Sequence, residues 1–165
     1  DIAIQAALTG HLVFSTLHTN DAPSAITRLI DMGVKPFLVA SSIQAVLAQR
    51  LGRVLCNNCK QLDPNPDPKF LSLVDITPEE AAGKVMRPVG CPMCNKVGYK
   101  GRKALAEILR FNDTLRELVI SRAPVSQLKD AARKAGMRSL RDVAVLAVRN
   151  GQTTLQEINR VTFVS

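Results

Sequence analysis

Four cysteines are the residues of this sequence whose spacing is best suited to holding a metal ion. One pair stands in RLGRVLCNNCKQ (residues 50–61), and a second pair with the same two-residue gap stands in VGCPMCNKVGYKGR (residues 89–102). Two residues between cysteines let both sulfurs face one ion from a tight turn, and two such turns complete a tetrahedral set of four sulfurs, which suits Zn²⁺. The predicted zinc ligands are Cys56, Cys59, Cys91 and Cys94.

Other uses of the four cysteines are less favoured. Disulfides need an oxidising compartment, and the sequence has no export signal. A redox C-x-x-C motif belongs near a βαβ pattern, whereas the second pair leads into a glycine-rich turn. An iron–sulfur cluster is also compatible with four cysteines. The predicted zinc site would have protein sulfurs in all four positions, so it indicates a structural ion and not a catalytic one.

Two histidines bracket an apolar run in TGHLVFSTLHT. The residues between His11 and His18 are mostly apolar or β-branched, which predicts a buried strand over residues 12–17. Ligands of open α/β sheets bind beyond the carboxyl ends of strands, where His18 and Thr19 would lie. A helix N-terminus follows at Asp21, and such ends attract phosphate oxygens. We therefore expect a phosphate to approach His18 and this helix end.

The composition is that of a globular protein with a basic balance. The 165 residues are 46% hydrophobic and 22% charged, with a formal charge of +8. A basic protein can bind nucleic acid or an anionic membrane, but these cations are spread along the chain and aromatic residues for base stacking are scarce. No apolar run approaches the 18 or more residues that a membrane-spanning helix needs. The chain opens on Asp1 within a helical pattern, which suggests a fragment of a longer protein.

Helix and strand signals alternate along the first part of the chain. We expect the end of a helix over residues 1–10, a helix over residues 20–33 capped by Asn20 or Asp21, and a helix over residues 36–52. RVLC (residues 53–56) reads as a short strand that leads into the first cysteine pair.

Residues 61–90 change in character and read as an insertion between the cysteine pairs. Its prolines exclude a long helix or a central strand, although Thr77 and Pro78 can begin one short helix. KALAEILRF (residues 103–111) then reads as a strand. The helical patterns that follow cover residues 113–121, 124–135, 139–149 and 153–160.

These motifs resemble those of the ATPases of type II secretion and type IV pilus assembly. The resemblance runs from AIQAALTGHLVFSTLHTNDAPSAITRLIDMG through the cysteine pairs to TTLQEINRVT, nearly the whole chain. The family's histidine box matches TGH and STLHTND here, and its assembly-type members carry a four-cysteine zinc element at this place. The resemblance implies an α/β fold: the C-terminal part of a RecA-like P-loop NTPase core, with the zinc element inserted and a helical region at its end.

The resemblance also implies a division of the chain and a set of partners. Residues 1–55 would be the last part of the ATPase core, residues 56–102 the tetracysteine element with its proline-rich insertion, and residues 103–165 the final core strand and a helical subdomain. The family's members are hexamers of the bacterial cytoplasm, and they work at the inner membrane with platform proteins of secretion or pilus systems. No nucleic-acid partner is expected.

Site residues follow from the histidine box by resemblance. His18 would approach the nucleotide's γ-phosphate and report its loss, so it is the expected catalytic residue. The expected nucleotide-binding residues are His11, Thr16, Thr19 and Arg50, with Arg50 the weaker candidate because it also suits an ion pair at a helix end. Glu107 reads as structural. The sequence lacks the G-x-x-x-x-G-K-S/T phosphate loop, so we expect ATP and Mg²⁺ to bind only in a full-length protein and this chain alone not to hydrolyse ATP.

Three alternatives accompany this interpretation. The histidine box suits a type II secretion motor and a type IV pilus assembly motor about equally, with secretion preferred. A zinc ribbon that binds nucleic acid would explain the cysteines and the charge but not the histidine box. A pilus retraction motor is disfavoured because, by resemblance, retraction motors lack the cysteine element.

Overall fold

The computed structural model describes residues 2–162, which divide into two compact units. The first unit is built from the residues up to Ala48 together with Ala106–Ser139. The second is built from Gln49–Leu105 together with the residues from Leu140 onward. Each unit therefore combines two stretches that lie far apart in the sequence, so the insertion between the cysteine pairs and the last helices belong to one unit.

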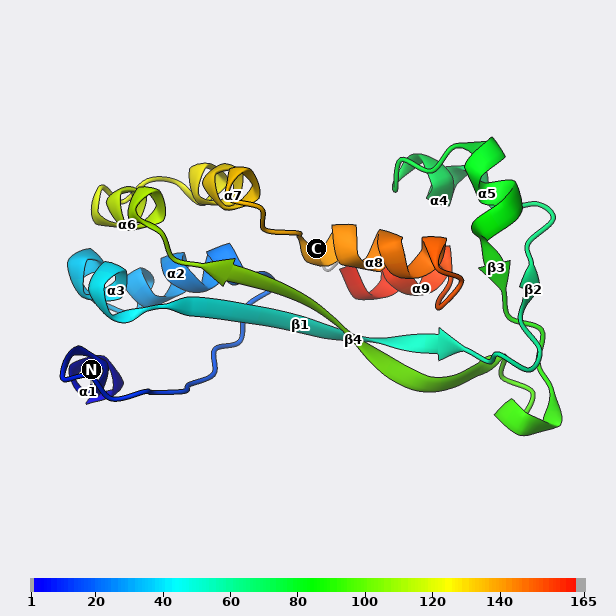
Figure 1. The fold of residues 1–165 in the computed structure, drawn as a ribbon, viewed down its shortest axis with the longest axis horizontal. Helices are drawn as coiled ribbons and strands as arrows, with labels where there is room; N and C mark the ends of the chain where they lie inside the picture. The colour runs from blue at the N-terminus through cyan, green and yellow to red at the C-terminus, as the bar shows by residue number, and fades with distance from the viewer. Residues whose placement is uncertain (1, 163–165) are drawn as a thin grey trace. The chain divides into compact units, whose positions relative to one another are not determined.

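Helices make up most of the first unit (Figure 1). They are α1 (Ile2–Leu8), α2 (Ala22–Asp31), α3 (Pro36–Ser42), α6 (Asp113–Ile120) and α7 (Val125–Lys134). Buried apolar side chains of α2, α3, α6 and α7 form its core together with Leu109 of strand β4 (Tyr99–Arg110). The apolar stripe of each of these helices faces the others, as expected for amphipathic helices.

The second unit holds the insertion and the last two helices (Figure 1). Apart from parts of two long strands, its elements are β2 (Gln61–Leu62), α4 (Pro68–Ser72), α5 (Pro78–Lys84), β3 (Met86–Arg87), the 3₁₀ turn η1 (Pro92–Cys94), α8 (Leu140–Arg149) and α9 (Leu155–Thr162). Strands β2 and β3 pair antiparallel, with Gln61 opposite Arg87 and Leu62 opposite Met86. The guanidinium of Arg149 on α8 donates to the Glu80 carboxylate of α5 at 2.9 Å, so an ion pair ties the insertion to the last helices.

The two long strands position the cysteines. Strand β1 (Ala45–Leu55) is hydrogen-bonded to β4 in a two-stranded sheet. Cys56 follows β1 directly, and β4 begins shortly after Cys94. The sheet therefore brings the two cysteine pairs together although 31 residues separate them in the sequence.

The mixed α/β class and most predicted helices are confirmed. Asp21 caps α2 by accepting a hydrogen bond from Ser24 N–H at 2.8 Å, and Thr77 caps α5 in the same way through Glu80 N–H. The helical patterns after residue 112 match α6 to α9 within one or two residues at each end. The expected division at residues 55 and 102 into core, zinc element and helical subdomain stays a prediction.

The predicted helix over residues 36–52 is wrong in its second half. Helix α3 ends at Ser42, and β1 begins at Ala45 and absorbs the short strand expected over RVLC. From Ala45 to Leu51 the side chains alternate between exposed and half-buried, which is the period of a strand. The Ala, Leu and Gln residues of this stretch suit a helix, but pairing with β4 overrides that local preference.

The predicted strand over residues 12–17 is also wrong. Residues 11–19 have no regular secondary structure, and Leu12 and Phe14 are 82% and 88% exposed. A strand needs a hydrogen-bonded neighbour, and within residues 2–162 the two long strands pair with each other. Residues 12–17 do not pair with either long strand.

Candidate functional site

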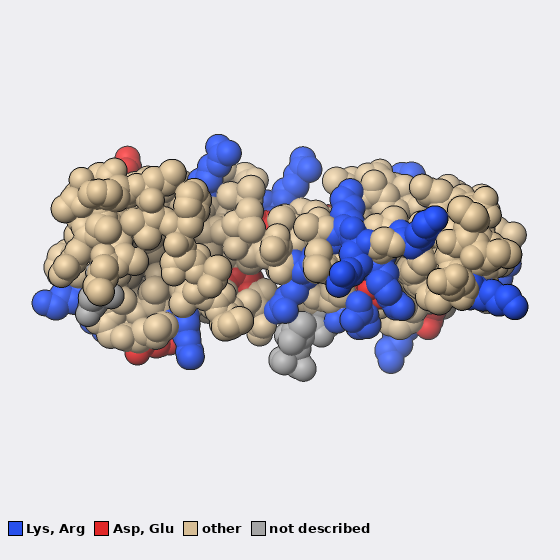
Figure 2. Space-filling view, turned by 90° about the horizontal axis from the view of Figure 1, so that it is seen from below, with Lys and Arg blue, Asp and Glu red and all other residues tan. Residues whose placement is uncertain are grey.

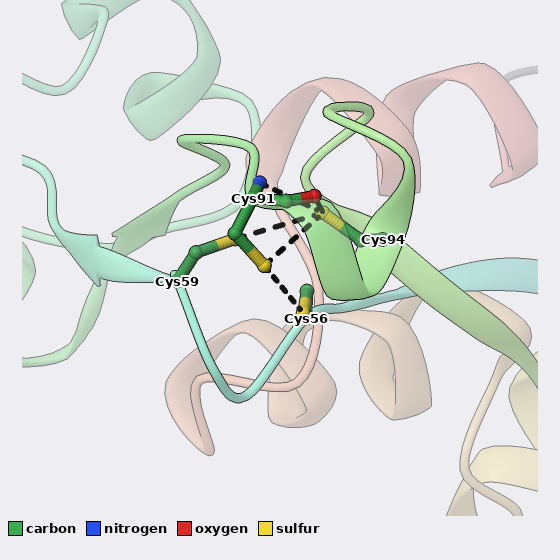
Figure 3. Close-up of side chains that lie close together, drawn as sticks. All are labelled: Cys56, Cys59, Cys91 and Cys94. Atoms are coloured by element: carbon green, nitrogen blue, oxygen red, sulfur yellow. Dashed lines mark hydrogen bonds between the residues drawn. The ribbon is translucent and has the colours of Figure 1, made fainter.

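The four cysteine sulfurs converge in the second unit (Figure 3). The Sγ–Sγ distances are 3.9 Å from Cys56 to Cys91, 3.8 Å from Cys59 to Cys94 and 3.7 Å from Cys91 to Cys94. All four sulfurs lie within 4.8 Å of one another. Four ligands at about 2.3 Å from a tetrahedral Zn²⁺ ion would stand about 3.8 Å apart. The spacing therefore fits a four-sulfur metal site and excludes a disulfide between these residues, because a bonded pair would stand about 2.05 Å apart.

Backbone and side-chain N–H groups surround the sulfurs. Gly90 N–H donates to Cys59 Sγ at 3.3 Å, and Gly98 N–H donates to Cys94 Sγ at 3.2 Å. The Asn58 amide donates to Cys91 Sγ at 3.4 Å. Hydrogen bonds to the charged form of a group favour that form, so these donors suit thiolates, which are the species that bind metal.

The thiol pKa values are spread apart. The hydrogen bond from Asn58 lowers the pKa of Cys91 to about 6, although burial opposes it. Burial raises the pKa of Cys59 to about 11. A cluster that holds protons on some sulfurs near neutral pH must release them when a metal binds, so metal affinity is expected to rise with pH.

Two glycines permit the tight approach of chain segments around the cluster. A Cβ at Gly90 would lie 2.6 Å from the Lys96 carbonyl oxygen, and a Cβ at Gly98 would lie 2.4 Å from Pro88 Cβ. Both residues also have positive φ, +105° and +82°, a conformation that favours glycine. Glycine is therefore required at these two positions for the second cysteine turn to close.

Further contacts fix the first cysteine turn. Cys56 N–H donates to the Gly98 carbonyl at 2.9 Å, which joins the two cysteine turns through the backbone. The Lys60 ammonium donates to the Gly151 carbonyl at 2.9 Å, and Leu55 N–H donates to the Gln152 carbonyl at 2.8 Å. The cysteine cluster is thus anchored to the loop between α8 and α9.

The histidine segment, residues 9–20, is mostly exposed. His11 and His18 are both exposed, and His11 Nδ1 lies 3.0 Å from the Thr9 hydroxyl. Thr16 is exposed, and the Thr19 hydroxyl donates to the Asp21 carbonyl at 3.2 Å. Their nucleotide roles stay predictions.

Arg50, the fifth residue expected to bind nucleotide or phosphate, lies on β1 in the second unit and is half-buried. Its expected contact with a nucleotide likewise stays a prediction.

Carboxylates occupy the helix end at which phosphate was expected. Ala22 N–H donates to Glu107 Oε1 at 2.6 Å, and Ser24 N–H donates to Asp21 Oδ1. Lys129 forms an ion pair with Asp21 at 2.7 Å. Two carboxylates therefore already accept hydrogen bonds at the N-terminus of α2, and the expected approach of a phosphate to this helix end stays a prediction. The structural interpretation of Glu107 is confirmed, since this buried carboxylate joins β4 to α2.

Glu107→Ala is expected to destabilise the protein by about 2–3 kcal/mol, because it leaves the buried Ala22 N–H without that acceptor. Urea unfolding followed by circular dichroism measures the change. Glu117→Ala removes an exposed carboxylate from α6 and is the matched control. Equal midpoints for the two variants would contradict the buried role of Glu107.

Sequence reasoning missed a buried ion-pair network in the second unit. Glu157 on α9 has no exposed side-chain surface and accepts hydrogen bonds from Arg53 and Arg160 at 2.6–3.1 Å. Arg53 also lies over the Tyr99 ring, with Cζ 4.4 Å from the ring centre. A single glutamate in an amphipathic helix pattern gives no signal of such burial, and the partner Arg53 is 104 residues away.

Comparisons with known proteins agree with the motifs. The family model described as type II/IV secretion system protein matches residues 1–160. Similar proteins include the type II secretion system protein HxcR of Pseudomonas aeruginosa, 50% identical over 98% of this chain, and the type II secretion system ATPase E of Vibrio cholerae, 47% identical over 98%. The type IV pilus assembly ATPase PilB of Myxococcus xanthus is 46% identical over 96% of this chain.

The chain spans only part of these relatives: 30% of HxcR, 31% of the Vibrio cholerae ATPase and 28% of the Myxococcus xanthus protein. Within residues 2–162, no helix combines the length and the apolarity needed to cross a membrane. The family match covers nearly the whole chain, including the histidine segment and the cysteine cluster. The chain therefore belongs to the type II/IV secretion system protein family.

Proposed function

We propose that the four cysteines bind one structural Zn²⁺ ion. The observation that carries this proposal is the set of Sγ–Sγ distances of 3.7–3.9 Å, which match the edges of a tetrahedral zinc–thiolate site. The ion would join the end of β1 to the turn that precedes β4. It would also close the base of the insertion, whose short helices have few buried side chains of their own.

Metal analysis of the purified protein tests the zinc proposal. We expect about one equivalent of zinc per chain, and Co²⁺ substitution should give the absorption of a tetrahedral tetrathiolate. A protein that folds fully without bound metal, or that carries iron with a cluster spectrum, would contradict the proposal.

We further propose that this chain is part of a hexameric ATPase that powers pseudopilus assembly in type II protein secretion. Support comes from a relative named as a type II secretion system ATPase, from others named as type II secretion system proteins, and from the histidine box. ATP and Mg²⁺ would be held mainly by parts of the full-length protein other than this chain, because this sequence has no phosphate loop. The protein would act in the cytoplasm, at the inner membrane, with the platform proteins of the secretion system.

Type IV pilus assembly is the second candidate function, because pilus assembly ATPases are nearly as similar to this chain as secretion proteins are. Deletion of the gene separates the two. Loss of protein export with normal pili supports secretion, and loss of surface pili with normal export supports pilus assembly.

His18→Ala is expected to lower the turnover number of the full-length enzyme by about tenfold or more while changing nucleotide affinity less. The reason is that a group which senses the γ-phosphate acts on the reacting state more than on the bound ground state. Steady-state hydrolysis and nucleotide binding are measured in parallel. Ser15→Ala, at an exposed position of the same segment, is the control, and wild-type turnover in His18→Ala would refute the sensing role.

A further inference from the structure

The second cysteine turn exposes three apolar side chains beside the metal ligands. Val89, Met93 and Val97 are 50%, 60% and 57% exposed. Single exposed apolar residues are common on protein surfaces and need no explanation. Here three exposed apolar side chains lie within nine residues, on a turn whose backbone is tightly constrained. This clustering indicates a binding surface.

Backbone contacts place two of these residues, Val89 and Val97, on facing segments of the turn. Residue 90 lies against residue 96, and residue 98 lies against residue 88, because a Cβ on either glycine would collide with the facing residue. Val89 and Val97 stand between these two contacts, one on each segment. Their proximity therefore depends on the backbone of the turn, so it does not rest on the chance position of two mobile side chains.

The cysteine sulfurs hold Val89 and Val97, here called the apolar pair, in place. Gly90 N–H donates to Cys59 Sγ, and Gly98 N–H donates to Cys94 Sγ. Each valine is thus the immediate neighbour of a glycine that is bonded to a metal-ligand sulfur. A metal ion on the four sulfurs would fix the apolar pair as a rigid surface.

Cations without partners adjoin the apolar pair. Lys96, Lys100 and Arg102 are exposed, and within residues 2–162 their side chains make no hydrogen bond or ion pair. The sequence from Ala81 to Ala106 contains no Asp or Glu. In the view of Figure 2, Lys and Arg side chains are more prominent than Asp and Glu side chains.

These cations differ from their neighbours in the same unit. Lys103 donates to the Gln152 side chain at 2.7 Å, and Arg53 and Arg160 are held by Glu157. The free cations also lie close to the valines along the chain, since the six Cα–Cα steps from Lys96 to Arg102 span at most about 22 Å. Together they form one surface, here named the knuckle surface: Val89, Met93, Lys96, Val97, Lys100 and Arg102.

We propose that the knuckle surface docks a segment of a partner protein that carries an apolar side chain flanked by Asp or Glu. The apolar pair would receive the anchor, and the unpaired cations would face the carboxylates. This inference rests on the proposed metal site, because the sulfurs hold the two glycines. A protein interface of this kind gains specificity and association rate from charge complementarity.

Nucleic acid fits the knuckle surface poorly. Single strands bind through aromatic faces on which bases stack. The aromatic residue beside this surface, Tyr99, has its ring covered by Arg53, and its hydroxyl lies 2.9 Å from the Thr154 hydroxyl. The cations alone would give only weak binding that disappears as salt is raised.

A membrane also fits the knuckle surface poorly. Interfacial anchors are amphipathic helices with many apolar and aromatic side chains. Here three apolar side chains stand on a rigid turn, and none of them is aromatic. Membrane binding is therefore an outcome of the test and not the proposal.

A peptide selection tests the docking surface. A display library of random twelve-residue peptides is first passed over the full, zinc-loaded chain that carries Val89→Ser and Val97→Ser, and the peptides that bind this variant are discarded. The remaining peptides are then selected for binding to the wild-type chain. We expect the recovered peptides to combine an apolar residue with Asp or Glu. They should bind the double-serine variant, and a Lys96→Glu/Arg102→Glu variant, at least tenfold more weakly, and added salt should weaken wild-type binding.

Matched controls come from the same unit. Leu146→Ser removes an exposed apolar side chain from α8, and Lys69→Glu reverses an exposed charge on α4. Both should leave peptide binding unchanged. Recovered peptides that are basic or neutral, or that bind all variants equally, would overturn the docking proposal, as would tight binding to phosphatidylglycerol vesicles that displaces the peptides.

Metal analysis of each variant separates this inference from the proposed zinc site. The serine and glutamate variants should keep the wild-type zinc content, because they replace no ligand. A chain that binds zinc but selects no peptides refutes the docking surface alone. A chain that selects acidic peptides without any metal refutes the zinc proposal and shows that the hydrogen bonds of the sulfurs to Gly90 and Gly98 hold the docking surface without an ion.

Discussion

Cys56→Ser should remove most of the bound zinc and lower the melting temperature by about 8–16 °C. The substitution leaves three sulfur ligands, and structural zinc sites contribute on the order of 10–16 kcal/mol of apparent binding free energy to folding. A loss of about 4 kcal/mol would produce this shift in a chain of this size. The effect should be large because Cys56 is buried and directly follows β1.

Zinc content and thermal unfolding are measured on the same samples, with and without a chelator. Asn57→Ser is the matched control, because it changes the exposed neighbour of Cys56 and no ligand. The chelator should lower the melting temperature of the wild type and of Asn57→Ser, but that of Cys56→Ser much less. A Cys56→Ser protein as stable as the wild type would mean that the cluster is not a structural metal site.

Glu157→Gln should destabilise the protein by about 3 kcal/mol. Breaking a buried ion pair commonly costs 3–5 kcal/mol. The lower end is expected here because the side chains of Arg53 and Arg160 are about half exposed and regain water when the carboxylate is removed. The buried amide of the variant would also present N–H groups to guanidinium donors.

The pH dependence of stability gives a second test of Glu157. Burial by itself raises the pKa of this carboxyl, but the hydrogen bonds from Arg160 and Arg53 outweigh burial and lower the pKa to about 2, from an ordinary value of 4.5. A lowered pKa means that the folded state favours the ionised form. The stabilisation is therefore complete above about pH 4.5 and is lost as the pH falls towards 2, with a total of about 3 kcal/mol.

Urea unfolding of wild type and Glu157→Gln between pH 7 and pH 3 measures this contribution. The difference in free energy of unfolding between the two proteins should shrink as the pH falls. Glu117→Gln, at an exposed position on α6, should follow the wild type throughout. A constant difference across the range would show that the charge of Glu157 is unimportant to folding.

Local signals were sufficient for most of the helices and for the pairing of the four cysteines. Helix caps and stops act within a few residues, so Asp21, Thr77 and Gly33 could be assigned from the sequence. The cysteine ligands were equally predictable, because a two-residue gap is itself the geometry that turns two sulfurs towards one ion. The resemblance to secretion ATPases rested on such local motifs and agrees with the family match.

Features that depend on distant partners were mispredicted or missed. Residues 45–52 have helical preferences, yet they form part of β1 because β4 offers a strand to pair with. Residues 12–17 have strand preferences, yet within the described residues they pair with no other strand and form none. The burial of Glu157 was missed for the same reason, because it depends on the guanidinium groups of Arg53 on β1 and Arg160 on its own helix.

The sequence by itself determined that the chain has two cysteine turns fit for one metal ion, a histidine box and an amphipathic helical end. These properties are encoded in spacings of two to four residues and need no knowledge of the fold. Only the tertiary structure decided that the two turns meet, because β1 must pair with β4 before the four sulfurs can converge. It also decided that Glu107 of β4 accepts the hydrogen bond of Ala22 N–H at the start of α2, since only the fold brings residues 85 positions apart together.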